Sequence, residues 1–420
     1  MWESIRKMWK IPELRNKILY TLGMLLLFRL VGVIPAPGVD AARVLTGTAT
    51  DLPILQLVNM MTGSNFANMT IMAMGITPYI NASIIMQLLT IAIPALERMQ
   101  RDEEGGGREK IARITRYVTV GLAAVQAIGL VAGLGYIKSG WFNYVLVGIS
   151  MAGGSALAMW IGERITQNGV GNGISLLIFV GIIASFPGQV YTGIQSVILN
   201  PMSAWAIPVV IVGIIVLVVG IVFVDSGQRR IPVQYAKRMV GRKMYGGQST
   251  HIPMKVNSTG VMPLIFAISI IQFPGLIAQF WPTSGFALWY GRWFNASSWV
   301  YMVVYALLIL FFTYFYTSIS FNPTEMSKNL QQNGGFIPGI RPGKPTSDYL
   351  DGILEYIILI GACGLIIVCL VPIIVSGLFS VSRLSFGGTS LIIIVGVVLE
   401  TIKAVESQML VRNYKGFLND

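Results

Sequence analysis

The chain has 420 residues, of which 54% are hydrophobic and 11% are charged, and its mean hydropathy is +0.69. Soluble domains carry about 25% charged residues, so this composition excludes a soluble globular protein and indicates a polytopic membrane protein. The formal charge of +12 is typical of basic cytoplasmic loops before it indicates nucleic-acid binding. Cys363 and Cys369 lie in one apolar run and predict no disulfide framework.

Ten apolar segments reach the length of about 20 residues that a transmembrane helix needs. Residues 1–17, before the first of them, are polar and basic, and no signal-peptide cleavage pattern follows. The predicted spans are 18–36, 70–96, 118–137, 144–162, 174–192, 206–224, 259–280, 299–321, 350–375 and 387–409.

The basic residues divide unequally between the two sides of these spans. Of the 30 lysines and arginines, 25 lie in the two terminal segments and the alternate loops on their side, and 4 lie in the other loops. The remaining one, Arg29, lies inside the first span. Because cytoplasmic loops carry an excess of Lys and Arg, we expect both termini in the cytoplasm.

The membrane interior is almost free of ionisable groups. Away from the span ends, Arg29 is the only charged residue in a span. Ion-coupled transporters normally place ionisable groups at mid-depth, which disfavours a secondary transporter, although carbonyls of an unwound helix can bind sodium. His251, the single histidine, lies in a polar loop, so the spans hold no Ser–His dyad or zinc ligand set. We therefore expect no enzyme, cofactor or metal site, but a path or a surface.

The second span contains the stretch "MGITPYINASIIMQLL" (74–89), which is apolar with several polar but uncharged residues. Such residues indicate hydrogen bonds between helices or a water-filled lumen. Ser83 and Gln87 share one helix face at i, i+4. Pro78 removes a backbone hydrogen bond and predicts a bend in the outer third of the span.

Two pairs of isoleucines recur at helical spacing. Ile76 and Ile80 lie in the second span, and Ile178 and Ile182 lie in the fifth. Branched apolar side chains at one level can form a constriction that closes by dewetting. Isoleucines at this spacing are also common on lipid-facing surfaces, and the pattern alone leaves both interpretations open.

Three further segments are unusual for simple connections. The outward segment 57–69 is moderately apolar but too short to span, so it is an interfacial helix or a re-entrant segment. The cytoplasmic loop 225–258 has seven basic residues and alternates Ile231, Val233 and Tyr235, which predicts a strand, followed by a turn at "GRKMYGG". Glycines and prolines in the loop 323–349 predict a stiff extended arm. Both loops are expected to dock a large soluble partner.

Seven stretches carry a resemblance to a known family over essentially the whole chain. They are "RLVGVIPAPGVD" (29–40), "MGITPYINASIIMQLL" (74–89), "WIGERITQNGVGNGISLLIF" (160–179), "GQRRIPVQYAKR" (227–238), "STHIPMKVNSTGVMPLIFA" (249–267), "FNPTEMSKNLQQNGGFIPGIRPG" (321–343) and "FGGTSLIIIV" (386–395). The chain resembles the SecY family, the central subunits of the bacterial protein-conducting channel.

The resemblance implies an all-α membrane protein of ten helices in two inverted pseudo-symmetric halves, 1–195 and 196–420, around an hourglass pore. An apolar ring at the waist would consist of Ile76, Ile80, Ile178, Ile182, Ile265 and Ile393. A re-entrant plug helix at about 57–69 would seat below it, with Asn59, Met60, Met61, Thr62, Gly63, Ser64, Asn65 and Phe66. A lateral gate between spans 2 and 3 and spans 7 and 8 would contain Gln87 and Asn257.

The family also implies partners. The resemblance places the motor ATPase SecA and the ribosome on the cytoplasmic loops, at Arg229, Arg230, Arg242, Lys243 and Arg341. The SecE and SecG subunits, signal sequences, unfolded secretory chains and the lipid of the bacterial cytoplasmic membrane complete the expected set. An insertase or scaffold without a through-path, or a secondary transporter, remains the alternative function.

Overall fold

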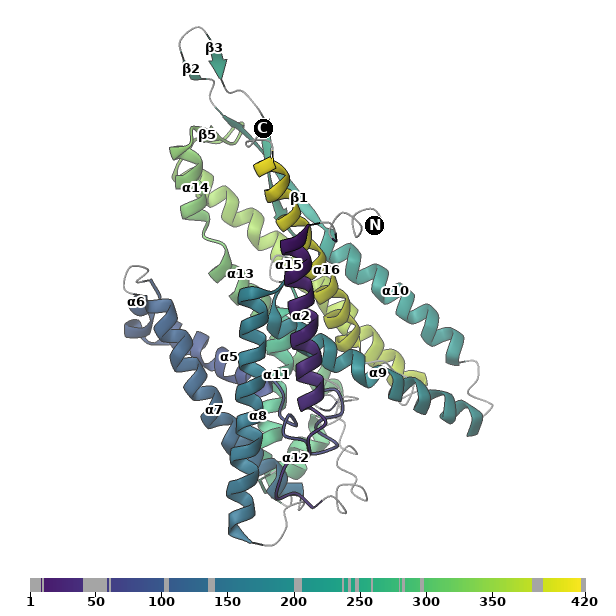
Figure 1. The fold of residues 1–420 in the computed structure, drawn as a ribbon. Coiled ribbons are helices and arrows are strands. Elements are labelled where there is room, and N and C mark those ends of the chain that lie inside the picture. The colour runs from purple at the N-terminus through teal and green to yellow at the C-terminus, as the bar shows by residue number, and fades with distance from the viewer. Residues whose placement is uncertain are drawn as a thin grey trace.

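The computed structural model describes residues 9, 11–40, 59, 62–101, 106–134, 140–199, 206–235, 238–240, 243–245, 249–257, 260–278, 280–281, 284–294, 298–379 and 388–416. Long helices form a bundle, and strands project from one end of it (Figure 1). The first residues of α2 and the last turns of α16 lie at that same end (Figure 1).

Each of the ten predicted spans contains a helix, as expected from the apolar runs. These helices are α2 (Pro12–Val31), α5 (Thr77–Ala92), α7 (Gly107–Leu134), α8 (Trp141–Asn168), α9 (Gly173–Leu199), α10 (Ala206–Ser226), α11 (Met262–Ala278), α13 (Trp299–Ser320), α15 (Lys344–Phe379) and α16 (Gly388–Gly416). Three short helices join them, namely α6 (Pro94–Arg101), α12 (Gly285–Trp293) and α14 (Pro323–Gln332).

Not every helix is long enough to cross a bilayer alone. Within the described ranges, four are both long and apolar enough, Glu109–Ala132, Trp141–Asn168, Trp299–Gln332 and Lys344–Ile374. The bent pair Thr77–Ala92 and Pro94–Gln100 makes a fifth if it counts as one span. Gly173–Gly188, Ile211–Ser226 and Met262–Gly275 are shorter apolar helices. The fold is a helical membrane bundle, and the expected number of ten spans stays a prediction.

The second predicted span, 70–96, is built differently from the expectation. Residues 70–76 form turns, and α5 begins only at Thr77. Pro78 occupies the first turn of α5, where its missing N–H has no helical acceptor, so it starts the helix and the predicted bend is wrong. The chain bends instead by 106° between α5 and α6, at Ile93 before Pro94.

The two large loops predicted to be cytoplasmic form one unit and not two separate arms. Strand β1 (Gln228–Tyr235) lies between β4 (Ser249–Lys255) and β5 (Gly335–Phe336), antiparallel to both. In the register of this sheet, Ile231 is opposite Ile252 and Gln234 is opposite Phe336. We call this sheet, with the apolar side chains that pack on it from α14 and α15, the platform.

A separate hydrophobic core supports the platform. The predicted alternation is confirmed, because Ile231 and Val233 are buried while their neighbours on β1 are exposed. The buried members of this core are Ile231, Val233, Met254, Leu330, Ile337, Leu350, Ile353, Leu354, Ile357 and Ile358. Because five of them belong to α15, the sheet is packed directly onto the N-terminal part of a bundle helix.

Three details of these loops differ from the expectation. The start of the 323–349 loop is not extended, because α14 forms there, with the Asn322 side chain accepting from the Glu325 N–H at 3.3 Å. His251 lies in β4 and not in a loop. The described part of the predicted turn, Lys243–Tyr245, is strand β3, paired with β2 (Arg238–Val240).

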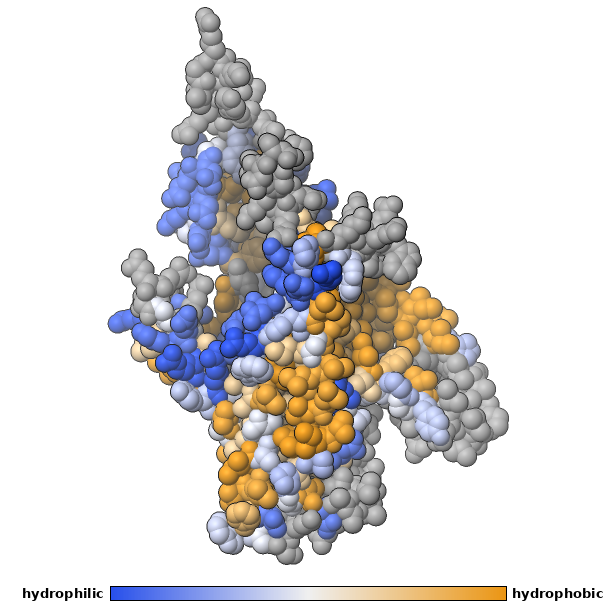
Figure 2. All heavy atoms as spheres, viewed as in Figure 1, coloured by the Kyte–Doolittle hydropathy of each residue, from blue (hydrophilic) through white to orange (hydrophobic). Residues whose placement is uncertain are grey.

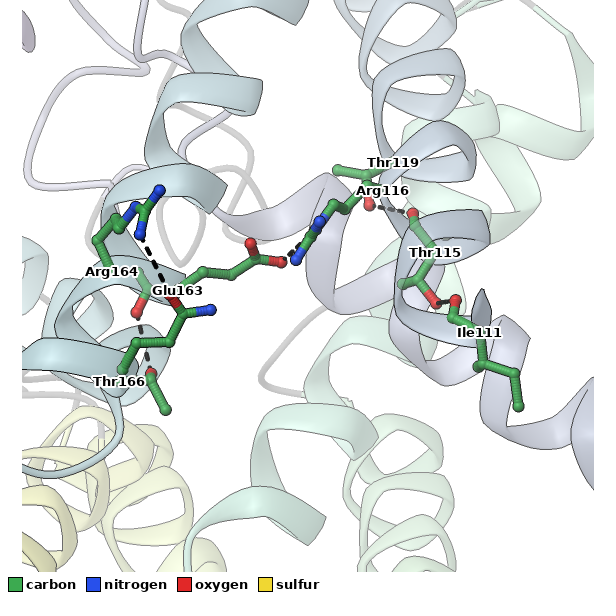
Figure 3. A network of polar contacts seen from close by, with 9 residues as sticks. Ile111, Thr115, Arg116, Thr119, Glu163, Arg164 and Thr166 are labelled. Carbon is green, nitrogen blue, oxygen red and sulfur yellow. Dashed lines mark hydrogen bonds and ion pairs between the residues drawn. The ribbon is translucent and has the colours of Figure 1, made fainter. Parts of the chain in front are cut away.

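Polar contacts between the helices lie toward the basic end of the bundle. Figure 2 shows hydrophilic residues gathered around α6 and α14 and an apolar surface over the lower bundle and α10. In Figure 3, Arg116 of α7 points at Glu163 of α8, and their side chains form an ion pair at 2.8 Å. The hydroxyls of Thr115 and Thr119 donate hydrogen bonds to backbone carbonyls one turn earlier in α7, at 2.9 and 2.7 Å.

Candidate functional site

The six isoleucines proposed for the waist all lie in one continuous cluster of buried apolar residues, here called the isoleucine cluster. They come from α5 and its N-cap, α9, α11 and α16, so both halves of the chain contribute. Their side chains are 1–6% exposed, and their numbers are Ile76, Ile80, Ile178, Ile182, Ile265 and Ile393. Periodicity pointed to the first four, whereas Ile265 and Ile393 followed only from the resemblance.

Residues 62–69, here called the outer segment, are turns and not the expected plug helix. Asn59 organises them, since its side-chain oxygen accepts from the Ala67 N–H at 2.8 Å and its carbonyl accepts from the Ser64 N–H at 2.9 Å. Met69 and Ser64 adopt positive φ angles of 46° and 69°, which a helix does not contain. Met60 and Met61 lie outside the described residues.

The outer segment is nevertheless buried and held between two helices. Thr62, Asn65 and Phe66 are 2%, 4% and 0% exposed. The Arg29 guanidinium of α2 donates to the Gly63 carbonyl at 3.3 Å. The close approach requires glycine at position 63, because a Cβ there would lie 2.3 Å from Arg29 Nη1 and 2.9 Å from the Gly181 carbonyl oxygen of α9.

This contact places the outer segment beside the isoleucine cluster. Gly181 directly precedes Ile182 in α9. On the other side, the Thr62 methyl group lies next to Gly75, which directly precedes Ile76, because a Cβ on Gly75 would be 3.2 Å from it. The outer segment therefore closes against two of the elements that supply the cluster.

The polar face of α5 contacts the second half of the chain. The Tyr316 hydroxyl of α13 donates to Gln87 Oε1 at 2.9 Å, and Gln87 Nε2 donates to Ser83 Oγ at 3.4 Å. The predicted Ser83–Gln87 face is confirmed by this bond. Nothing in the sequence indicated Tyr316, which is 229 residues away from Gln87.

Asn257, the second expected gate residue, lies in a different polar contact. Its Nδ2 donates to Asp225 Oδ1 at 3.4 Å, and Asp225 also forms an ion pair with Lys403 of α16. These residues join the ends of α10 and β4 to α16. No hydrogen bond between the described residues links Asn257 to Gln87, so their shared role as gate residues stays a prediction.

The bundle contains a set of buried amides and hydroxyls, of which the resemblance named Asn65 and Asn257, whereas sequence reasoning missed Gln126, Ser155, Ser175 and Gln272. Each is at most 9% exposed and has at least one polar atom without a hydrogen-bond partner among the described residues. They are Asn65, Asn81, Gln126, Ser155, Ser175, Asn257 and Gln272.

The expected docking residues that the structure describes lie on the platform and its hairpin. Arg229 and Arg230 are exposed on β1, and Lys243 lies in β3. Arg341 is exposed after β5, and its carbonyl accepts from the Thr346 hydroxyl at 2.8 Å. Arg242 lies outside the described residues. Within the described ranges no three His, Cys, Asp or Glu side chains converge as metal ligands.

Comparison with solved structures finds the same architecture. The structure described as "The structure of a protein conducting channel" aligns with a TM-score of 0.64 and 20% identity, over 94% of this chain and 92% of that one. Canine Sec61, from "the Canine ribosome-channel complex from the endoplasmic reticulum", gives a TM-score of 0.61 and 18% identity, over 94% and 92% of the two chains. At these identities the similarity concerns the fold.

Sequence comparison gives a closer relationship. The family described as SecY matches residues 70–402. The protein translocase subunit SecY of Corynebacterium glutamicum is 41% identical, over 99% of both chains, and that of Streptomyces coelicolor is 43% identical, over 100% of both. The Mycobacterium tuberculosis subunit is 43% identical over 97% of both chains. The chain belongs to the SecY family of protein translocase subunits.

Proposed function

We propose that unfolded secretory polypeptides cross the membrane through the centre of this subunit, and that apolar segments leave it sideways into the bilayer. One observation carries this proposal: isoleucines from both halves of the chain meet in a single buried cluster, which the outer segment closes on one side. The halves are 1–195 and 196–420. The names of the curated relatives, protein translocase subunits, support the same activity.

The chemistry of the cluster suits a passage for chains of any composition. Fixed charges on the wall would trap segments of opposite charge, and the cluster has none. Branched apolar side chains can separate to admit a chain and pack around it. They also limit ion leakage, because an ion must lose its hydration shell to pass an apolar constriction.

Lateral release requires a seam that lipid can reach. We place it between α5 and α7 of the first half and α11 and α13 of the second, where α5 packs against α11. An apolar segment entering this seam gains about 0.3–0.6 kcal/mol for each Leu-like residue that reaches the lipid. Gln87 and Asn257 are assigned to this seam in the proposal.

The energy for transport comes from partners. The isoleucine cluster is buried apolar packing and supplies no energy of its own, so we assign the work to the motor SecA or to the translating ribosome. Both would dock on the platform through Arg229, Arg230, Arg242, Lys243 and Arg341. SecE and SecG complete the complex in the bacterial cytoplasmic membrane, with both termini of this chain in the cytoplasm, as the basic loops predict.

Site-specific photo-crosslinking tests the route. A photoreactive residue replaces Ile182, which is 3% exposed, and a secretory chain is stalled part-way through reconstituted vesicles. Ile183 is the matched control, because it is the next residue of α9 but is 45% exposed on the outside of the bundle. We expect strong crosslinks to the stalled chain from position 182 and none from position 183.

The opposite pattern would reject the through-path. If position 182 gives no crosslink while the chain is stalled, the isoleucines are ordinary packing residues, and an insertase or scaffold becomes the better description. A secondary transporter predicts instead a saturable flux of a small molecule, which the same vesicles can measure without any secretory chain.

A further inference from the structure

A cavity of about 220 Å³ lies where the C-terminal end of α13 and the N-terminal part of α15 meet the start of α14. Its apolar lining includes Leu354 and Ile358, which belong to the core of the platform. Asp351 and Glu355 also line it, one turn apart on α15. Pockets for whole small molecules measure about 300–1,000 Å³, so this cavity fits a single small polar group.

The two carboxylates of the cavity have no counterion among the described residues. Within the described part of the chain, neither Asp351 nor Glu355 forms an ion pair or a side-chain hydrogen bond. Like charges at i, i+4 on a helix repel each other. A cation bound between them would relieve this repulsion.

The other polar groups of the cavity have already donated their protons. The hydroxyls of Tyr314, Thr317 and Ser318 each donate to a backbone carbonyl, at 3.4, 2.7 and 2.9 Å. The Phe321 N–H donates to the Thr317 carbonyl at 2.9 Å, and Pro323 has no N–H. Because ionised carboxylates only accept hydrogen bonds, the described lining offers acceptors and no free side-chain donor.

A negative cavity that contains only acceptors is selective for one kind of ligand. A phosphate or a carboxylate would be repelled and would find no donor. A quaternary ammonium has the positive charge but no N–H to donate. A primary ammonium has the charge and three N–H donors, so it matches both properties of the cavity.

The surroundings of the cavity favour a lipid as the source of this ammonium. The predicted spans 299–321 and 350–375 place the cavity at the membrane–water interface on the platform side, where lipid headgroups lie. Deeper in the bundle, Phe311 and Leu359 follow on the same helix faces as Ser318 and Glu355, and they are 51% and 44% exposed. An apolar surface for acyl chains thus continues from the cavity, which a lysine side chain would not need.

We propose that this cavity binds the primary ammonium group of an amine-headed phospholipid in the leaflet next to the platform. The ammonium lies between Asp351 and Glu355, the acyl chains lie along Phe311 and Leu359, and the phosphate stays in the headgroup layer outside. Because the cavity borders the core of the platform, the bound lipid attaches the platform to the membrane surface.

Competition between lipids tests the site. The complete complex, with its partner subunits, is reconstituted in phosphatidylcholine vesicles that contain a trace of phosphatidylethanolamine with a photoreactive acyl chain. Crosslinked peptides of α13 and α15 are quantified by mass spectrometry. The unlabelled competitors are phosphatidylethanolamine, its monomethyl and dimethyl derivatives, and phosphatidylglycerol. Each methyl group removes one N–H donor and keeps the charge, so we expect competition to weaken at each step and phosphatidylglycerol not to compete.

Variants and a matched control assign the binding to the two carboxylates. Asp351→Asn and Glu355→Gln keep the shape of the side chain and remove its charge, and each should weaken phosphatidylethanolamine binding about tenfold. Asp348→Asn makes the same change at an exposed position of α15 outside the cavity and should bind as the parent does. Copurification of the partner subunits shows whether each variant assembles. The methyl series needs no variant, so it decides the question even where a substitution prevents assembly.

Three results would overturn the proposal. Equal competition by phosphatidylethanolamine and its dimethyl derivative would mean that apolar contact alone holds the lipid. An equal loss of binding in Asp348→Asn would mean that the effect follows any lost charge on α15. Finally, a photoreactive residue in place of the exposed Ser318 should crosslink to lipid, and crosslinks to a partner subunit instead would mean that a protein side chain occupies the cavity. None of these measurements uses a secretory chain, so their outcome is independent of the transport route.

Discussion

The platform and the waist of the bundle are held together by different kinds of contact. In the platform, β1 is joined to β4 and β5 by backbone ladders with a defined register, over an apolar core of its own. At the waist, the isoleucine cluster holds by side-chain packing. The outer segment is held by burial of Phe66 and Met69, by the Arg29 contact and by one backbone hydrogen bond from Ala36 to Met69, and the Tyr316 hydroxyl bridges the seam.

The difference follows from what each region has to do. Backbone ladders are cooperative, and a load applied to one strand is shared by its neighbours. Side-chain contacts can be broken one at a time and re-formed after a chain has passed. In the proposed function, a rigid region that receives force sits on a region that separates, and the two should respond differently to substitution.

The largest effect is expected where the platform meets the motor. Reversing the charge in Arg341→Glu should reduce motor-driven export to background while the complex still assembles, because this exposed side chain lies in the loop between β5 and α15, beside the platform. Export by reconstituted vesicles and copurification of the partner subunits measure the two properties. Lys328→Glu makes the same charge change on the exposed face of α14 and should export normally. Unchanged export by the Arg341 variant would refute the docking assignment.

Substitution of a buried residue in its core should destabilise the platform. Ile231 is 2% exposed, and Ile231→Ala should destabilise the sheet by about 2–5 kcal/mol. The exposed neighbour Gln234→Ala should change stability by at most about 0.5 kcal/mol. Limited proteolysis of the loops as a function of denaturant distinguishes the two variants. Equal protection of both would mean that the apolar core does not stabilise the sheet.

The closure of the waist can be loosened at the outer segment. Gly63→Ala and Gly106→Ala introduce the same strain, since the two φ angles are +67° and +66°, but only position 63 is crowded, by Arg29 and Gly181. The crowding should cost the closed state about 1–3 kcal/mol more at position 63. Ion flux through vesicles should therefore rise in the Gly63 variant alone, and equal fluxes would place the seal elsewhere.

The smallest effect is expected at the Asp225–Lys403 ion pair. The Lys403 side chain is 40% exposed, so water screens the pair, and Lys403→Met should destabilise the protein by at most about 1 kcal/mol. Thermal unfolding of the parent and the variant in low and high salt measures this loss of stability. A larger loss that is insensitive to salt would mean that Asp225 supports the platform through Asn257.

Local signals in the sequence predicted local structure well. The alternation of Ile231 and Val233 gave the strand, and the apolar runs gave a helix in every predicted span. The predicted start of the helix in the second span was wrong because the buried turns before Thr77 are as apolar as a helix. In addition, a proline such as Pro78 is compatible both with the first turn of a helix and with a bend inside one.

Contacts between distant parts of the chain had no local signal. The pairing of β1 with β5 involves two residues of a loop about a hundred positions away, too few for any periodicity. The Tyr316–Gln87 bond depends on how two helices pack, which hydrophobic patterns do not specify. Nothing in the sequence indicated that Gly63 is crowded by Arg29 on one side and by Gly181 on the other.

The short length of α5 has a mechanical consequence. Its 16 residues make a rod of about 24 Å, free of internal proline, that ends in a tight turn at Ile76 and in the 106° corner at Ile93. A rod jointed at both ends can tilt as a whole without stretching any of its own backbone hydrogen bonds. The work of moving it is then set by the contacts along its sides and not by its own backbone hydrogen bonds.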